Sequence, residues 1–257
     1  MRTYSRRGFL AVLAWPVFGI AGAAVFGCGS DAPDEVGTLP ATSTAPPVPS
    51  PSATQPPTPP STKAPLNADL HRIVDKKRAL PDGYAPPNVE AIPVSWHAGN
   101  VSSQQLRADV IVALRPMFEA AKADQVTLYV ESAYRSYNEQ VRTFNYWVSV
   151  VGEAQARRES AEPGHSEHQL GTTVDFADPS NGWQLLESFA GSPSGRWLAA
   201  NAHKFGFAMS YPPNGEAITG YIYEPWHFRY IGVAAAREWH ASGKTLIEYL
   251  EALAAAG

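Results

Sequence analysis

The sequence predicts a single α+β domain behind a long N-terminal segment that does not join its core. Residues 31–65 hold 11 of the 23 prolines, and this clustering is typical of a tail. Residues 66–257, 192 in number, are enough to build one domain with a sizeable core. Helical and strand patterns follow one another there without regular βαβ alternation, and no internal repeat is present. We therefore expect a small antiparallel sheet flanked by helices.

The first half of this domain predicts two helices with a strand between them. Apolar residues recur at helical spacing over 103–123, where Pro116 is expected to kink or interrupt the helix. Alternating Val and Leu residues over 126–132 predict a strand. A capping-box pattern that begins at Ser136 predicts a helix over about 137–157.

The second half predicts shorter elements. We expect, in order, a strand at 172–176, a helix at 194–204, β-rich segments at 205–211 and 219–231, and helices at about 233–241 and 246–255. Thr245 and Glu248 form a second capping-box pattern, which fixes the start of the last helix.

Charge and cysteine content exclude several classes of protein. Twenty basic against 24 acidic side chains give a formal net charge of -4, which argues against a nucleic-acid partner, because such a partner requires a basic field. The single cysteine, Cys28, cannot form an internal disulfide or a thiolate-based metal site. Any metal site must therefore be built from His, Asp and Glu.

The N-terminus predicts export. Residues 1–27 carry three arginines and no acid, and residues 8–27 carry no charge, which is the pattern of a signal segment. Arg6 and Arg7, followed by Gly8-Phe9-Leu10, resemble the twin-arginine motif of proteins that are exported folded; a general secretory signal is the alternative.

The apolar run ends in Val25-Phe26-Gly27-Cys28, which resembles a bacterial lipobox in which Cys28 is lipidated and becomes the new N-terminus. Ordinary cleavage or an uncleaved membrane anchor are the alternatives. We expect residues 28–65 to form a Pro/Ser/Thr-rich linker that holds the domain on the outer face of the bacterial cytoplasmic membrane, toward the cell wall. A spacer with no particular target is the simpler interpretation of the same composition.

Three stretches concentrate polar residues that a core would not select: 132–136, 166–175 and 224–227. Two histidines and an aspartate among them supply the donor atoms of a catalytic Zn²⁺ site that leaves its fourth position to water. A nearby carboxylate that does not bind the metal can accept a proton from such a water. Composition alone makes this grouping weak, because the chain has seven histidines.

The order and spacing of four motifs make the grouping specific. Ser-Ala-Tyr-Arg-Ser-Tyr at 132–137, Pro-Gly-His-Ser-Glu-His-Gln-Leu-Gly at 163–171, Val-Asp-Phe at 174–176 and Glu-Pro-Trp-His-Phe-Arg-Tyr at 224–230 together resemble the VanY-type D-alanyl-D-alanine carboxypeptidases, which are zinc peptidases of bacterial cell walls. The resemblance covers roughly residues 66–250 and implies a hedgehog/DD-peptidase-type fold around one zinc ion.

The resemblance also implies roles for particular residues. The zinc ligands would be His168, Asp175 and His227, the catalytic base Glu224, and the contact to substrate or transition state Arg135. Residues expected to line the substrate pocket are Ser132, Gln140, Ser166 and Trp226.

Competing assignments remain open at this point. Asp178 is a second candidate ligand, Glu167 is a second candidate base, and His165 is expected at the rim of the pocket. Glu224 and His227 are three residues apart and would lie on opposite faces of a regular strand, so Pro225 is expected to create a turn or bulge that directs both inward.

Two departures from the family pattern leave the reactive groups in place. Ala133 stands where the family usually has glycine, and Thr172-Thr173 replaces a more apolar pair. Ala133 lies in the loop that presents Arg135, so this departure concerns the geometry of substrate binding rather than the metal ligands.

The expected function is a zinc-dependent D-alanyl-D-alanine carboxypeptidase that trims the terminal D-Ala of peptidoglycan stem peptides. An L,D-carboxypeptidase, a D,D-dipeptidase or an endopeptidase would use the same site. A non-catalytic wall-binding lipoprotein is the alternative from another class, and retention of the ligands together with Glu224 argues against it.

Overall fold

The computed structural model describes residues 67–256 apart from 69 and 100–103. The predicted export signal, Cys28 and the linker lie outside the described residues. Within the described part of the chain, no helix is both long and apolar enough to span a membrane.

A four-stranded antiparallel sheet forms the centre of the domain. Its strands lie in the order β3 (Tyr129–Ser132), β4 (Thr173–Ala177), β6 (His227–Tyr230) and β5 (Phe207–Met209). A separate pair joins β1 (Val89–Ala91) to β2 (Gln105–Arg107). All five residues of β4 are buried, because the strand lies between two others and is covered on both faces. The predicted α+β class is confirmed.

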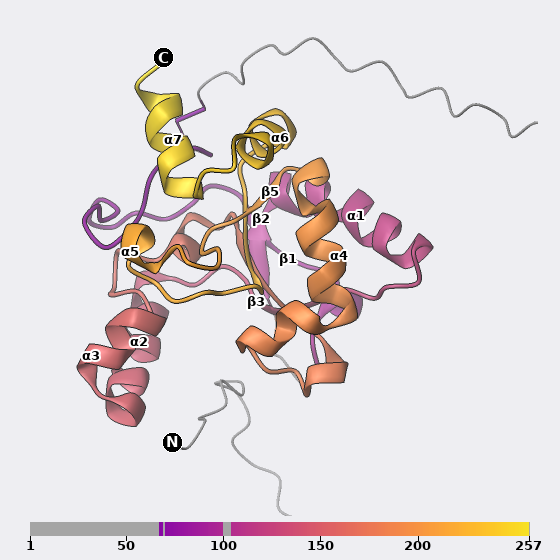
Figure 1. The fold of residues 1–257 in the computed structure, drawn as a ribbon. Coiled ribbons are helices and arrows are strands. Elements are labelled where there is room, and N and C mark those ends of the chain that lie inside the picture. The colour runs from indigo at the N-terminus through magenta and orange to yellow at the C-terminus, as the bar shows by residue number, and fades with distance from the viewer. Residues whose placement is uncertain (1–66, 69, 100–103, 257) are drawn as a thin grey trace, which may run out of the picture. The chain divides into compact units, whose positions relative to one another are not determined.

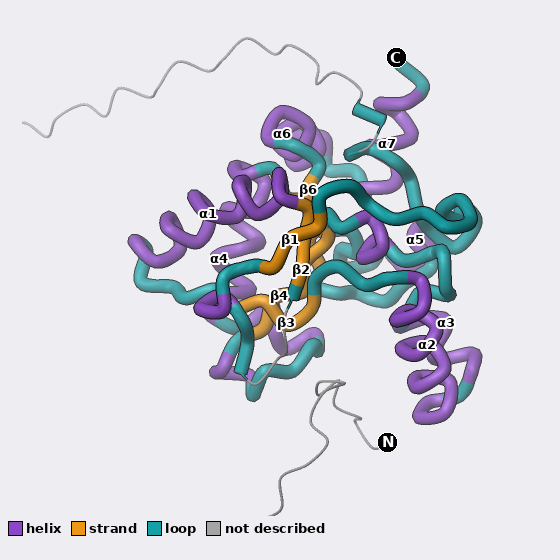
Figure 2. Tube along the Cα trace, turned by 180° about the vertical axis from the view of Figure 1, so that it is seen from behind, coloured by secondary structure: helices purple, strands orange, loops and turns teal. Residues whose placement is uncertain are grey.

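Helices flank the sheet in separate groups. Figure 2 shows α1 (Ala108–Ala123) and α4 (Pro193–Asn201) on one side of the strands, and α2 (Tyr137–Val151), α3 (Glu153–Glu159) and α5 (Glu216–Thr219) on the other. Helices α6 (Val233–Ser242) and α7 (Leu246–Ala254) close the chain and lie near one another (Figure 1). Short 3₁₀ turns complete the elements: Val94–Trp96, Glu167–Leu170 (η2), Pro179–Asn181, Glu187–Gly191 and Ala202–Phe205 (η5).

The main core lies between the sheet and the α1–α4 side. The apolar stripe of α1, with Val110, Leu114 and Met117, packs in one cluster with Phe176 of β4 and Phe228 of β6. A second cluster joins α6 and α7 to the neighbouring sheet edge. The chemistry-bearing strands β4 and β6 are therefore held rigidly by the largest core of the domain.

Both capping boxes form as predicted. The side chain of Ser136 accepts from the backbone N–H of Glu139, whose carboxylate accepts from the N–H of Ser136, and Thr245 and Glu248 make the same pair at α7. These local hydrogen bonds satisfy N–H groups that a helix leaves without partners in its first turn.

Several predicted boundaries are wrong. Helix α1 begins at 108 rather than 103, because residues 105–107 pair with β1, and it continues through Pro116. The helix expected over 137–157 ends at Val151, because Gly152 has a positive φ of 81° and begins α3. Only His227–Tyr230 of the expected β-rich segment 219–231 is a strand.

Candidate metal centre

Two histidines and an aspartate converge from three different elements. Asp175 of β4 is register partner to His227 of β6, and His168 comes from η2, immediately before β4. Gly171 ends η2 in the left-handed region, where a Cβ would approach Arg107 and Pro86 to 3.1 Å, and this turn brings His168 back over the strand. One ligand atom from each side chain lies within 4.8 Å of the others.

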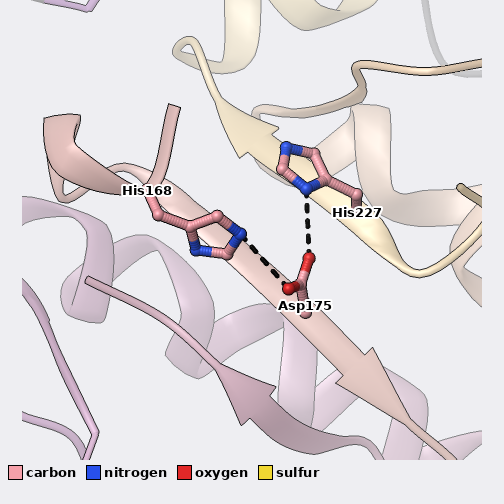
Figure 3. A group of neighbouring side chains, drawn as sticks. All are labelled: His168, Asp175 and His227. Carbon is pink, nitrogen blue, oxygen red and sulfur yellow. Dashed lines mark ion pairs between the residues drawn. The ribbon is translucent and has the colours of Figure 1, made fainter. Parts of the chain in front are cut away.

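The hydrogen bonds determine which atoms face the centre. His168 Nδ1 lies 2.6 Å from the carbonyl oxygen of Ala133; a carbonyl only accepts, so Nδ1 carries the proton and the Nε2 lone pair is left for the centre. That Nε2 lies 3.2 Å from Asp175 Oδ2, and His227 Nδ1 lies 3.1 Å from Asp175 Oδ1 (Figure 3).

The donor set fits a divalent cation. A ring lone pair and a carboxylate oxygen that face one another require a positive charge between them. Burial lowers the pKa of His227, but its contacts with Asp175 and Glu167 outweigh burial and raise that pKa to about 10, so the surroundings of this ring favour a positive charge. The nearby histidines likewise outweigh burial and hold the pKa of Asp175 well below its usual range. Two imidazole nitrogens, one carboxylate and a position left for water are the set that catalytic zinc sites use.

Glu224 reaches the same centre through a turn. The N–H of His227 donates to the carbonyl of Glu224 at 3.2 Å, and the N–H of Glu224 donates to the carbonyl of Tyr211 at 3.0 Å, so the backbone reverses at Pro225 before β6 begins. Glu224 is buried, with Oε2 at 3.7 Å from His227 Nδ1. The turn expected at Pro225 therefore directs both side chains inward.

Arg135 is held beside the centre by Gln140 and Ser132, two of the residues expected to line the substrate pocket. Its Nη1 donates to Gln140 Oε1 at 2.8 Å and its Nη2 to Ser132 Oγ at 3.1 Å. Its backbone N–H donates to the carbonyl of His168 at 3.2 Å, which ties the arginine loop to the ligand loop. Ala133 contributes through its carbonyl, a backbone group, so the replacement of glycine leaves this bond to His168 in place.

Three residues expected at the pocket wall are buried in the protein. Gln140 is fully buried and also donates to the carbonyl of Ala161 at 2.6 Å, so it contacts Arg135 from within the fold. Ser166 is 3% exposed, and its hydroxyl accepts from the N–H of His168 at the start of η2. Trp226 is 1% exposed and belongs to the main core.

The structure shows what each of the competing side chains contacts. Asp178 accepts from Ser180 and from the N–H of Ser194, so it organises the turn after β4. Glu167 points toward the far side of His227, where Oε2 lies 3.0 Å from Nε2. His165 Nδ1 donates to the backbone carbonyl of Asp75 at 2.7 Å.

Two residues near the centre were not predicted from the sequence. Burial and the negative charge of Asp175 raise the pKa of Glu131, in β3, to about 7; no sequence motif distinguishes this residue. Arg229 is fully buried and donates to Glu167 at 2.8 Å. Arg229 lies two residues after His227 and therefore on the same face of β6. The alternation of side chains along a strand could have predicted this placement from the sequence.

Comparisons with known proteins place the chain among peptidases. A family model described as VanY, D-alanyl-D-alanine carboxypeptidase, matches residues 103–233. The YodJ protein of Bacillus subtilis is 41% identical over 180 residues, which cover 70% of this chain and 66% of the relative. A D-alanyl-D-alanine carboxypeptidase of Enterococcus faecalis is 38% identical over 156 residues, 56% of each chain. The matches span less than two thirds of either relative.

Solved structures agree in fold. The LdcB LD-carboxypeptidase is 42% identical with a TM-score of 0.64, over 69% of this chain and 84% of that one. The D,D-pentapeptidase VanY in complex with Zn(II), a mutant from a VanB-type vancomycin resistance cassette, is 31% identical with a TM-score of 0.58, over 71% of this chain and 99% of that one. The second of these relatives binds the metal that the donor set described above would select.

Proposed function

The chain belongs to the VanY family of D-alanyl-D-alanine carboxypeptidases, and on this premise we propose that it is a zinc-dependent enzyme that removes the terminal D-Ala from peptidoglycan stem peptides. The observation that carries the proposal is the convergence of His168, Asp175 and His227, with Glu224 buried beside them. A binding protein without catalysis would not need a buried carboxylate at 3.7 Å from a ligand ring.

The chemistry divides between the metal and the chain. Zinc held by the three side chains would lower the pKa of a bound water and polarise the scissile carbonyl. Glu224 Oε2 takes up the proton of the attacking water and delivers it to the leaving amine nitrogen. Because Glu224 is held by a backbone turn, it needs little reorganisation to do so.

Arg135 is the residue suited to an anionic group of the substrate. A guanidinium binds a carboxylate through two parallel N–H groups, and a carboxypeptidase must recognise a free terminal carboxylate. The hydrogen bonds from Arg135 to Ser132 and Gln140 fix the plane of the guanidinium, so the substrate meets an oriented group.

An L,D-carboxypeptidase is the second candidate, and one observation favours it. The LD-carboxypeptidase LdcB has a higher identity and TM-score to this chain than the D,D-pentapeptidase VanY. D,D-dipeptidase and endopeptidase activities would use the same residues, and a wall-binding lipoprotein would use none of them catalytically.

One assay separates the D,D-carboxypeptidase, L,D-carboxypeptidase, endopeptidase and non-catalytic functions. The purified, zinc-loaded protein is incubated with defined penta-, tetra- and cross-linked muropeptides, and the products are identified by mass spectrometry. Loss of one D-Ala from the pentapeptide supports the main proposal, whereas cleavage of the tetrapeptide supports the L,D alternative. Binding without any cleavage would contradict both.

We also propose that the chain is exported and anchored by lipid on Cys28, with the domain facing the cell wall. The support is the basic and apolar N-terminus, the lipobox-like sequence and the Pro-rich linker. Metabolic labelling with a fatty-acid probe in the native host tests this. Cys28→Ser is expected to lose the label and leave the membrane fraction, and an unchanged label on the variant would contradict the anchor.

A further inference from the structure

Glu167 precedes the candidate ligand His168 in the sequence, but its side chain contacts the other candidate ligand histidine, His227. Its Oε2 lies 3.0 Å from His227 Nε2, and its Oε1 accepts from Arg229 Nη1 at 2.8 Å. The Ser210 hydroxyl lies 2.6 Å from Oε2. Glu167 is 4% exposed and Arg229 is 0% exposed, so water does not compete for these bonds.

These contacts decide which nitrogen of His227 carries the proton. Oε1 of Glu167 accepts from the guanidinium of Arg229 and Oε2 accepts from the hydroxyl of Ser210, so both carboxylate oxygens act as hydrogen-bond acceptors. His227 must donate from Nε2, and in the neutral ring the Nδ1 lone pair then faces Asp175.

The opposite tautomer of His227 would be unfavourable for two reasons. It would direct the Nδ1–H of His227 at the metal position, and it would leave the lone pairs of His227 Nε2 and Glu167 Oε2 facing one another in a buried place. A buried group without its hydrogen bond is costly, so the carboxylate selects one ring state.

Arg229 connects this carboxylate to the start of the domain. Its Nη2 donates to the backbone carbonyls of Leu70 at 2.8 Å and Arg72 at 2.6 Å. These residues precede the segment 103–233 that matches the family model. One fully buried guanidinium therefore joins the N-terminal segment to the partner of a metal ligand.

We propose that Glu167 is a positioning residue: supported by Arg229 and Ser210, it fixes the tautomer and ring orientation of His227 so that Nδ1 is presented to zinc. This inference rests on the proposed function only in requiring that the site binds zinc. Carboxylate–histidine pairs behind a metal typically alter affinity by about 10–100-fold when the carboxylate is removed.

The test measures zinc affinity by competition with a chelator, using the full chain. Glu167→Gln is expected to weaken zinc binding by about 10–100-fold. Arg229→Lys keeps the charge, but a single ammonium cannot donate both to Glu167 and to the carbonyls of Leu70 and Arg72 as the two terminal guanidinium nitrogens do, so it should shift affinity in the same direction. The matched control is Glu216→Gln, which removes an exposed carboxylate paired with Arg158 at 2.8 Å and should leave zinc affinity unchanged. Unchanged affinity in Glu167→Gln would overturn the proposal.

A second measurement needs no variant and so does not depend on one that folds. In the zinc-loaded wild-type chain with ¹⁵N-labelled histidine, NMR should find His227 protonated at Nε2 and metal-bound at Nδ1. Zinc on Nε2, or a proton on Nδ1, would overturn the proposal. Both readouts are independent of hydrolysis, so a protein that binds zinc in this manner but cleaves no muropeptide would contradict only the proposed function.

Discussion

Replacing Glu224 with glutamine tests the proposed mechanism most directly. Glutamine keeps the size of the side chain and its place in the turn, but its amide cannot accept the proton of the attacking water. Glu224 is 4% exposed, so bulk water cannot readily substitute as base. General-base catalysis contributes about 10²–10⁴-fold, which corresponds to about 2.7–5.4 kcal/mol in the barrier at 1.36 kcal/mol per tenfold. We expect kcat to fall by that factor.

The assay follows release of D-Ala from the pentapeptide at saturating zinc, with the metal content of each variant measured. The metal measurement is needed because the negative charge of Glu224, at 3.7 Å from a ligand nitrogen, also favours a cation. Glu131→Gln is the matched control, since Glu131 is the other carboxylate near the centre whose pKa, raised by burial and by Asp175 to about 7, would suit a base. It should lose less than about tenfold, below the range for a general base. Activity within tenfold of wild type for Glu224→Gln, with collapse of Glu131→Gln, would refute the assignment.

Three further predictions concern the metal, the core and pH. His168→Ala and His227→Ala should each lose most of the zinc that wild type binds at about one ion per chain, measured by atomic absorption; full occupancy would contradict the ligand set. Phe176→Ala should lower the free energy of unfolding by about 3–5 kcal/mol in urea titrations, because Phe176 is fully buried against Phe228. Burial and the stacked ring of His240 lower the pKa of His203 to about 4, so below about pH 6.5 the unfolded chain takes up a proton that the folded chain does not bind. The melting temperature should therefore fall from pH 6.5 toward 4, and less steeply in His203→Asn; equal slopes would contradict this.

The sequence determined the features that depend on neighbouring residues. Both capping boxes are local patterns, and the helices they begin start at the predicted residues. The candidate ligands were also predictable, because His168, Asp175 and His227 lie in motifs several residues long whose order is specific. Even the turn between Glu224 and His227 followed from the chemistry of Pro225.

Only the tertiary structure decided where buried polar side chains point. Glu167 stood beside His168 as a second candidate base, and its real partners come from β6, from Ser210 and, through Arg229, from residues 70 and 72. The spacing of residues along one element carries no information about Ser210 and His227, which are 43 and 60 residues away from Glu167 in the sequence. The burial of Gln140 and Trp226 could not be predicted for the same reason, because the neighbours that bury them come from other elements. A ligand set can be encoded in local motifs, but the hydrogen bonds that orient it exist only once distant strands and loops have packed together.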